Sequence, residues 1–369
     1  MLGICFGKKR RKGETMRFGI YAEMQCPDDK PFAVLYDEIF RQMVHADELG
    51  FDAYSIIEHH LFRNFGISAN PLALISAVAQ KTERIRFRTL LHTLPFHNPL
   101  RLAAEIAVAD IVTGGRIDCG VGRGHAWLYG PLNVPLEESR PRFDEALDIL
   151  IKAWTEERFS HKGTFWQFED VSVVPKPIQK PHPKLYTGGT SDITYQMAGE
   201  RDWGICVPPL LPWAVLEGPL DIYKEACAKA GNTPDILYLR PVYLGDNEAQ
   251  IRHEVEAAVH NFLKFNASPI FSKPPLPPKE ELIAKGYGFY ASGALESLTD
   301  LSYDDIVEQE IGFIGTPNKV IDQIGALREK GGIGELTILT NFGGIEHWKV
   351  IKTQELFADK VMPAFRQEC

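Results

Sequence analysis

Eight short β-rich runs recur along the chain, and segments with helical spacing separate them. Several runs are nearly continuous in apolar residues, as expected of parallel strands that helices cover on both faces. The runs begin at Arg17, Ala53, Ile85, Arg116, Lys184, Trp203, Ile236 and Glu335. Strand–helix alternation repeated eight times predicts an α/β fold of the (β/α)8 TIM barrel type, with a doubly wound open sheet as the weaker alternative.

The segments between the runs carry signals for helix ends. Three pairs place a capping side chain before a proline and predict helix starts: Asn70–Pro71, Asn98–Pro99 and Thr316–Pro317. Four glycines follow helical stripes and are expected to end helices in the left-handed conformation: Gly50, Gly114, Gly231 and Gly331.

Two stretches are longer than the connection that a strand–helix repeat needs. Residues 158–183 are typical of a hairpin with a proline-rich lead into the fifth strand, and residues 265–315 are too long for a simple connection. The predicted barrel therefore has insertions before strand 5 and between strands 7 and 8. We expect a single barrel domain over residues 16–369, in which the excursion 265–315 acts as a lid.

The composition is that of a soluble globular protein. Hydrophobic residues are 44% and charged residues 24% of the chain, and no apolar run approaches the ~18 residues of a membrane span. A dense basic run falls in residues 1–15, which we expect to form a flexible tail, either an electrostatic anchor or an unstructured extension.

The rest of the chain is acidic, since the net charge of the whole is -9, which argues against a nucleic-acid surface. The six cysteines are scattered without a CxxC pair. This cysteine usage suits a reducing cytoplasm.

The second β-rich run ends in Glu58, His59 and His60, at the barrel end where catalytic residues are expected. Such side chains are costly in a buried position unless they are paired or used. Adjacent residues on a regular strand point to opposite sides, so His59 and His60 are not expected to share a metal ion. An acid/base role needs only one imidazole, and a hydrogen-bonded structural trio is an equal alternative.

Two glycine-rich turns are candidate anion sites. In "GVGRGH", the small residues and the fork of Arg123 suit a planar or phosphate-bearing ligand, although a tight turn with a surface arginine fits as well. In "YTGGTSD", a Gly-Gly turn precedes a helix whose free backbone amides attract anions. The alternative for this second turn is a helix cap without a ligand.

Taken together, these stretches resemble the bacterial luciferase-like flavin-dependent monooxygenases. The resemblance lies in "GFDAYSIIEHH" with "GISANPL", then "HNPLRLAAEIAVADIVTGGRIDCGVGRG", then "KLYTGGTSD", in this order and spacing. It implies a TIM barrel that binds reduced FMN, delivered by a separate NAD(P)H:flavin reductase. Dioxygen would form a C4a-peroxyflavin that oxygenates a small apolar organic substrate such as an aldehyde or ketone. A homodimer is expected from the same resemblance.

The resemblance also assigns residues. Glu58 and His59 of the EHH motif are the expected catalytic residues, and no metal is expected. The expected cofactor-binding residues include a non-proline cis peptide and both glycine-rich turns: Leu90, Leu91, Gly122, Arg123, Gly188, Gly189, Thr190 and Ser191. The expected apolar walls of the substrate pocket are Phe62, Phe65, Trp127 and Tyr129.

The chain departs from the family pattern at two places. Gly122 stands where some luciferases carry a reactive cysteine, so no thiol role is expected. The turn after the fifth strand is rich in glycine where other members carry acidic and serine residues, which bears on the phosphate contacts.

Three alternative functions follow from the sequence. The first is an oxidoreductase of the same fold that uses the deazaflavin F420. The second is a metal-dependent barrel hydrolase built on Glu58, His59, His92 and His125. The third is a non-catalytic flavin-binding subunit, which is disfavoured because the chain keeps both the EHH and the RG residues.

Overall fold

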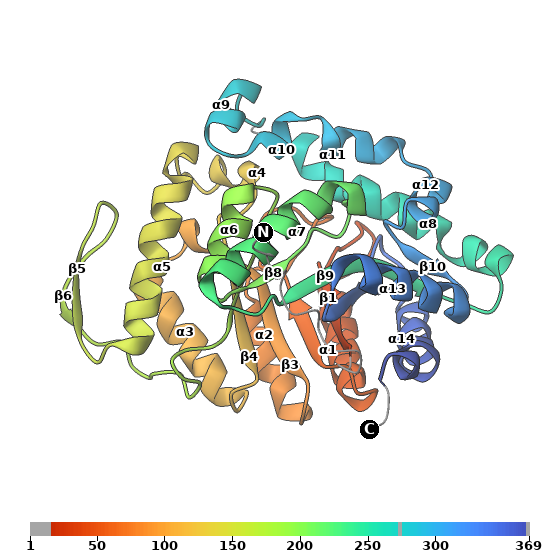
Figure 1. Cartoon of the computed structure of the whole chain (residues 1–369), viewed down its shortest axis with the longest axis horizontal. Coiled ribbons are helices and arrows are strands. Elements are labelled where there is room, and N and C mark those ends of the chain that lie inside the picture. Colours follow the sequence, from red (N-terminus) through yellow and green to blue (C-terminus); the bar gives the residue numbers. More distant parts are fainter. Residues whose placement is uncertain (1–15, 272–274, 367–369) are drawn as a thin grey trace, which may run out of the picture.

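Eight parallel strands close into a barrel in the computed structural model, which describes residues 16–271 and 275–366 (Figure 1). The barrel strands are β1 (Arg17–Ala22), β2 (Ala53–Ile56), β3 (Arg86–Thr93), β4 (Ile117–Gly122), β7 (Leu185–Gly188), β8 (Gly204–Cys206), β9 (Ile236–Leu244) and β11 (Glu335–Leu339). They pair in this order, and β11 pairs with β1 to complete the circle. The predicted (β/α)8 barrel is confirmed, and each predicted run contains one of its strands.

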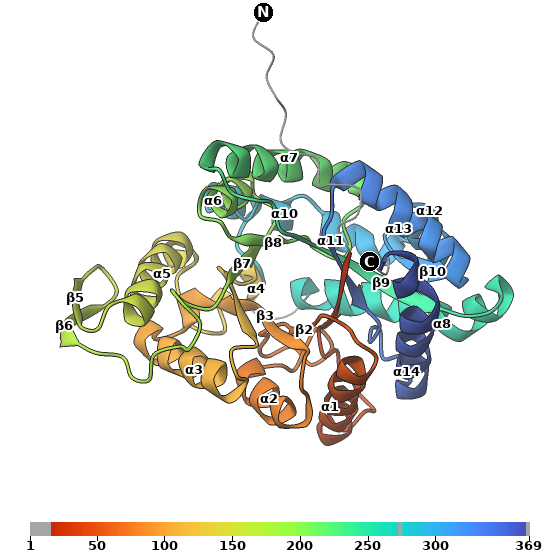
Figure 2. The same ribbon diagram turned by 60° about the horizontal axis from the view of Figure 1, so that its bottom comes forward.

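Helices surround the barrel, as Figure 2 shows. The larger ones are α1 (Phe32–Glu48), α2 (Pro71–Val78), α3 (Pro99–Val112), α5 (Ser139–Thr155), α6 (Asp192–Glu200), α7 (Trp213–Ala230), α8 (Glu248–Ala267), α13 (Pro317–Gly331) and α14 (His347–Leu356). Their apolar faces pack on the outside of the strands and form the main core. No helix in the described part of the chain is long and apolar enough to cross a membrane.

Most predicted helix ends are found where expected. The side chains of Asn70 and Asn98 each accept a hydrogen bond from a backbone amide in the first helical turn. The side-chain cap predicted at Thr316 is wrong, because α13 starts there without such a bond. Gly331 is the last residue of α13, and Gly332, with φ 60°, takes the left-handed turn instead.

Both predicted insertions are present. The strands β5 (Phe159–Lys162) and β6 (Gln167–Val171) form an antiparallel hairpin before the fifth barrel strand. Between β9 and β11 the chain forms α9 (Lys279–Ala284), α10 (Gly288–Ala291), α11 (Ala294–Ser297) and α12 (Tyr303–Glu308), here named the helical excursion (residues 279–308). It runs along the top of the molecule in Figure 1. A short strand that the sequence reading missed, β10 (Phe313–Gly315), then pairs with the end of β9.

A charged layer fills the barrel interior near the N-terminal ends of the strands. Arg88 on β3 is buried, and its guanidinium donates to Asp118 at 3.2 Å and to Glu335, across the barrel, at 3.0 Å. Gly19 makes room for this layer, since a Cβ there would lie 2.7 Å from Oε1 of Glu335. Buried charges are tolerated here because each has a partner.

The basic tail expected over residues 1–15 lies outside the described residues.

Candidate active site

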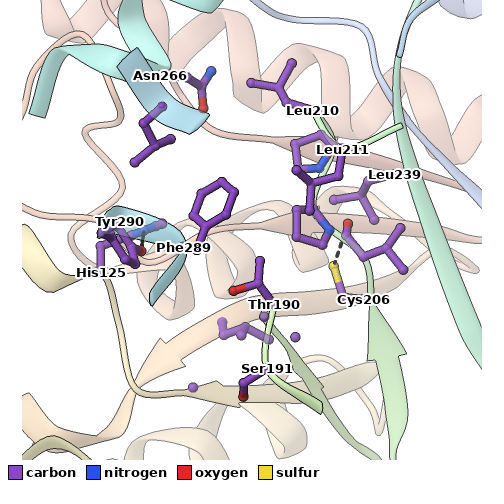
Figure 3. Close-up of a pocket in the computed structure, with 18 of the residues that line it drawn as sticks. His125, Thr190, Ser191, Cys206, Leu210, Leu211, Leu239, Asn266, Phe289 and Tyr290 are labelled. Atoms are coloured by element: carbon purple, nitrogen blue, oxygen red, sulfur yellow. Dashed lines mark hydrogen bonds between the residues drawn. The ribbon is translucent and has the colours of Figure 1, made fainter. Parts of the chain in front are cut away.

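A cavity of about 460 Å³ opens at the C-terminal ends of the barrel strands. Figure 3 shows His125 with Tyr290 on one side, Cys206 on the other, Ser191 and Thr190 below, and Asn266 above. Phe289 from the helical excursion projects between them. The cavity is therefore formed jointly by the strand ends and by the excursion.

All the residues predicted to bind the cofactor line this cavity: Leu90, Leu91, Gly122, Arg123, Gly188, Gly189, Thr190 and Ser191. The peptide bond between Leu90 and Leu91 is cis, at the place that the family resemblance implies. A Cβ on Gly122 would lie 2.8 Å from Cδ1 of Leu91, so glycine on β4 lets the Leu91 side chain pack directly against the strand. Contact of these residues with a cofactor stays a prediction.

One end of the cavity is suited to an anion. The turn Gly188–Ser191 leads into α6, whose first amides have no side-chain cap, and nothing lies within 4 Å of a Cβ built on Gly189. The guanidinium groups of Arg123 and Arg140 belong to the same cavity. Burial and then the proximity of Arg123 lower the pKa of Arg140, so two cations stand close together where an anion would relieve their repulsion.

Arg140 was not predicted from the sequence. It lies in the first turn of α5, well after the RG turn, among four other charged residues between 137 and 144. Nothing local in the sequence distinguishes it from them. The fold alone brings it to the cavity, through the placement of the start of α5.

Arg123 joins the barrel to the helical excursion. Its Nη1 donates to the carbonyl oxygen of Lys285 at 3.0 Å, and its Nη2 to that of Gly286 at 2.9 Å. The guanidinium also stacks over the ring of Tyr287, 4.5 Å from the centroid. The same cation thus faces the anion end and holds the excursion.

Glu58 is the centre of a buried polar cluster. Its carboxylate accepts hydrogen bonds from His60 Nε2 (2.9 Å), His92 Nδ1 (2.7 Å), His97 Nε2 (2.8 Å) and Thr93 Oγ1 (2.6 Å). Burial alone would raise the pKa of Glu58, but the bonds from the three histidines outweigh it and hold this pKa well below its usual range. Glu58 is therefore an anion that its donors saturate.

The pKa of the neighbouring His97 is shifted in the opposite direction to that of Glu58. Burial would lower its pKa, but the hydrogen bond and the charge of Glu58 raise it. Glu58, His92 and His97 lie close enough to hold a metal ion between them. The four ligands expected for a barrel hydrolase do not all meet, however. His59 and His125 pack against Trp127, on another side of the EHH motif from this cluster.

His59 is fully buried and does not line the cavity. Its ring packs against Phe65 with centroids 4.2 Å apart, and its Nε2 accepts a hydrogen bond from Trp127 Nε1 at 3.3 Å. Burial and then the neighbouring His125 lower the pKa of His59 well below its usual range. His59 is therefore a neutral imidazole that supports the two aromatic residues in front of it.

The four expected apolar walls divide into two pairs. Phe65 and Trp127 line the cavity, whereas Phe62 and Tyr129 do not. Phe62 lies beside His59, with ring centroids 6.0 Å apart. The hydroxyl of Tyr129 donates to the carbonyl of Arg123 at 2.5 Å, so Tyr129 supports the RG turn from behind.

Comparison with known families gives one match across most of the chain. The family model described as luciferase-like monooxygenase matches residues 16–333. Among curated proteins, the oxygenase component of the flavin-dependent trigonelline monooxygenase of Acinetobacter baylyi is 28% identical over 365 residues, which are 95% of this chain and 96% of that protein.

Solved structures show the same barrel. Monooxygenase RslO1 from Streptomyces bottropensis superposes with a TM-score of 0.79 at 26% identity, covering 95% of this chain and 100% of that one. The oxygenating constituent of 3,6-diketocamphane monooxygenase from Pseudomonas putida, solved in complex with FMN, superposes with a TM-score of 0.78 at 22% identity, covering 95% and 98%.

Proposed function

Because the chain belongs to the luciferase-like monooxygenase family, we propose that it uses reduced FMN and dioxygen to oxygenate a small apolar organic substrate, such as an aldehyde or ketone. The observation that carries this proposal is the composition of the cavity. It joins an anion end, made by Arg123, Arg140 and the turn before α6, to an apolar chamber under the helical excursion.

The residues present fit FMN. The phosphate would lie between the two guanidinium groups and the N-terminus of α6, where a charged acceptor gains several charge-assisted hydrogen bonds. The flat wall of Leu90, Leu91 and Gly122 offers an apolar surface for a planar ring. When bound, reduced FMN would supply the electrons that activate dioxygen.

The protein's own part in the reaction is to orient the substrate and to exclude water. Tyr287, Phe289, Tyr290 and Leu295 of the helical excursion bring apolar surface into the cavity. We propose that this excursion is the lid, which is held to the barrel through Arg123. His59 would act from behind, by fixing Phe65 and Trp127 and by remaining uncharged.

The proposed partners are a separate NAD(P)H:flavin reductase and a second copy of the chain. The name of the trigonelline enzyme, an oxygenase component, supports the reductase. The second copy is supported by the outer face of α3, on which Val108, Ile111 and Val112 are exposed.

The test supplies the purified protein with FMN that a flavin reductase keeps reduced, and compares oxygen consumed with hydrogen peroxide released. A substrate should divert oxygen from peroxide into an oxygenated product that mass spectrometry identifies. Peroxide yields that match those of free flavin for every aldehyde and ketone tried would refute the proposal. F420 replaces FMN in a parallel experiment to test the deazaflavin alternative.

A further inference from the structure

A second carboxyl group, Glu23, faces the cavity, and nothing above gives it a role. It follows β1 at the C-terminal end of the barrel, is 3% exposed, and lines the cavity. Among the described residues, Glu23 and Glu58 are the acidic residues on this wall. Glu58 is saturated by its donors, whereas Glu23 is not.

The carboxyl group of Glu23 is held in one orientation by two amides. Gln25 Nε2 donates to its Oε2 at 3.0 Å, and Asn266 Nδ2 donates to the same oxygen at 3.4 Å. Within residues 16–271 and 275–366, no hydrogen bond reaches Oε1. One oxygen is therefore a fixed acceptor, and the other is available to a ligand.

Both amides are themselves oriented by further bonds. Gln25 Oε1 accepts from the backbone amide of Gly343 at 2.8 Å, and Asn266 Nδ2 also donates to the carbonyl of Phe262 at 3.0 Å. Met24, between Glu23 and Gln25, has a positive φ of 57°, which is uncommon for a residue other than glycine. This backbone reversal accompanies the approach of the Gln25 amide to Glu23.

The surroundings of Glu23 favour its neutral form. Burial raises the pKa of Glu23 to about 8, and the Asn266 bond opposes this only in part. Among the described residues, no cation shifts the pKa of Glu23. Tyr21 and Cys206 on the neighbouring wall are neutral because burial raises their pKa values, and burial also lowers the pKa of His125 to about 4. Arg123 and Arg140 serve the anion end, and Glu58 belongs to its own cluster.

We propose that the protonated carboxyl group of Glu23 donates a hydrogen bond from Oε1 to a carbonyl oxygen of the substrate, so that ketones and aldehydes rather than hydrocarbons are its substrates. This inference rests on the proposed function, since it names the substrate class of the same cavity. The apolar body of such a molecule would contact Phe289 and Leu295, which also line the cavity.

The chemical consequence is that Glu23 is a catalytic residue. A donor aimed at the carbonyl oxygen stabilises the negative charge that develops there when a nucleophile attacks the carbonyl carbon. Because the two amides fix Oε2, the donor needs no reorientation during the reaction.

The first arm of the test measures the proton itself. Infrared difference spectra between the wild-type protein and Glu23→Gln should show the carbonyl stretch of a protonated carboxylic acid at pH 6, which disappears as the pH rises through about 8. Absence of this band at pH 6 would overturn the proposal. FMN binding by both proteins, measured separately, reports on the proposed function and on folding.

The second arm measures recognition with two probes of similar shape, cyclohexanone and methylcyclohexane, through their effect on the fluorescence of the protein. The wild type should prefer cyclohexanone by about five- to tenfold at pH 6, the value of one hydrogen bond. The preference should be lost at pH 9 and in Glu23→Leu, and largely kept at both pH values in Glu23→Gln, whose amide donates without titrating.

An equal preference in Glu23→Leu, or none in the wild type, would refute the assignment. Tighter binding of cyclohexyltrimethylammonium than of cyclohexanone at pH 6 would show an ionised Glu23 in place of the neutral donor and would equally overturn the assignment. If FMN is not bound at all, the proposed function fails, whereas the infrared result still decides the state of Glu23.

Discussion

Arg123→Ala is expected to weaken FMN binding while leaving riboflavin binding nearly unchanged. The two ligands differ in the phosphate, so their comparison isolates the anion end of the cavity. A hydrogen bond to a charged group contributes about 1.5–3 kcal/mol, which corresponds to about 10- to 150-fold in Kd.

The contacts of Arg123 indicate that the loss of FMN affinity lies in the lower part of that range. The guanidinium is only partly buried and already donates to the carbonyls of Lys285 and Gly286, so part of its hydrogen bonding is committed to the excursion. Its removal also relieves the repulsion that lowers the pKa of Arg140. We therefore expect a loss of about 10- to 30-fold for FMN.

Fluorescence titration of both flavins at two salt concentrations provides the assay. The gap between FMN and riboflavin should narrow at high salt, because ions screen the phosphate interaction. Arg123→Lys is the matched control, which keeps the charge but loses the fork and should show an intermediate loss. Equal weakening of FMN and riboflavin would refute the reasoning, because it would assign Arg123 to the excursion alone.

Four further outcomes are expected. Glu58→Gln should lower the free energy of unfolding by about 3–5 kcal/mol in denaturant titrations near pH 6, since it breaks a buried charge cluster. The lowered pKa of Glu58 stabilises the fold above pH 4.5, and this contribution is lost as the pH falls. The raised pKa of His97 stabilises the fold below pH 6.5, and this contribution is lost as the pH rises. A difference in unfolding free energy between wild type and Glu58→Gln that grew at either pH extreme would contradict this explanation. Tryptic cleavage after Lys285 should slow when reduced FMN is added, and unchanged cleavage would count against the lid. His59→Ala should increase peroxide release without changing FMN affinity by more than about threefold, as measured by oxygen and peroxide electrodes. Ile111→Glu should shift the protein to the elution volume of a monomer in size-exclusion chromatography. An unchanged elution volume would show that α3 is not the dimer face.

The barrel could be predicted because its signal is repeated. Eight apolar runs with helices between them leave few other arrangements, and each run contributes one strand. β10 was missed because a three-residue strand carries no periodicity and pairs only with the end of β9. Proline at the first helical position does not decide the cap bond, because Asn70 and Asn98 make it before a proline and Thr316 does not.

The site could be predicted only where it depends on local motifs. The glycine-rich turns and the EHH motif are each contiguous in sequence, and the turns and Glu58 line the cavity because they lie at strand ends. Glu23 and Asn266 meet across 243 residues, so no local pattern connects them. Glu23 is also inconspicuous, because a single glutamate next to a strand usually marks a solvent-facing position.

His59 illustrates a different limit. Its residue type and strand-end position indicated a group at the cavity surface, yet Phe65 and Trp127 stand in front of it. Which of two adjacent side chains faces inward depends on the path of the loop after β2, and the sequence does not specify that path.

The double engagement of Arg123 has a consequence for the order of events in a turnover. A group that contacts both a ligand and a movable segment couples their two equilibria, and the coupling free energy is the same in both directions. The guanidinium has further N–H groups for a phosphate while it keeps its bonds to the carbonyls of Lys285 and Gly286, so arrival of the flavin tightens the excursion and its departure loosens it. The resting protein is then the more open one, ready to capture reduced flavin from a reductase, and the rate at which spent flavin leaves is set by opening of the excursion.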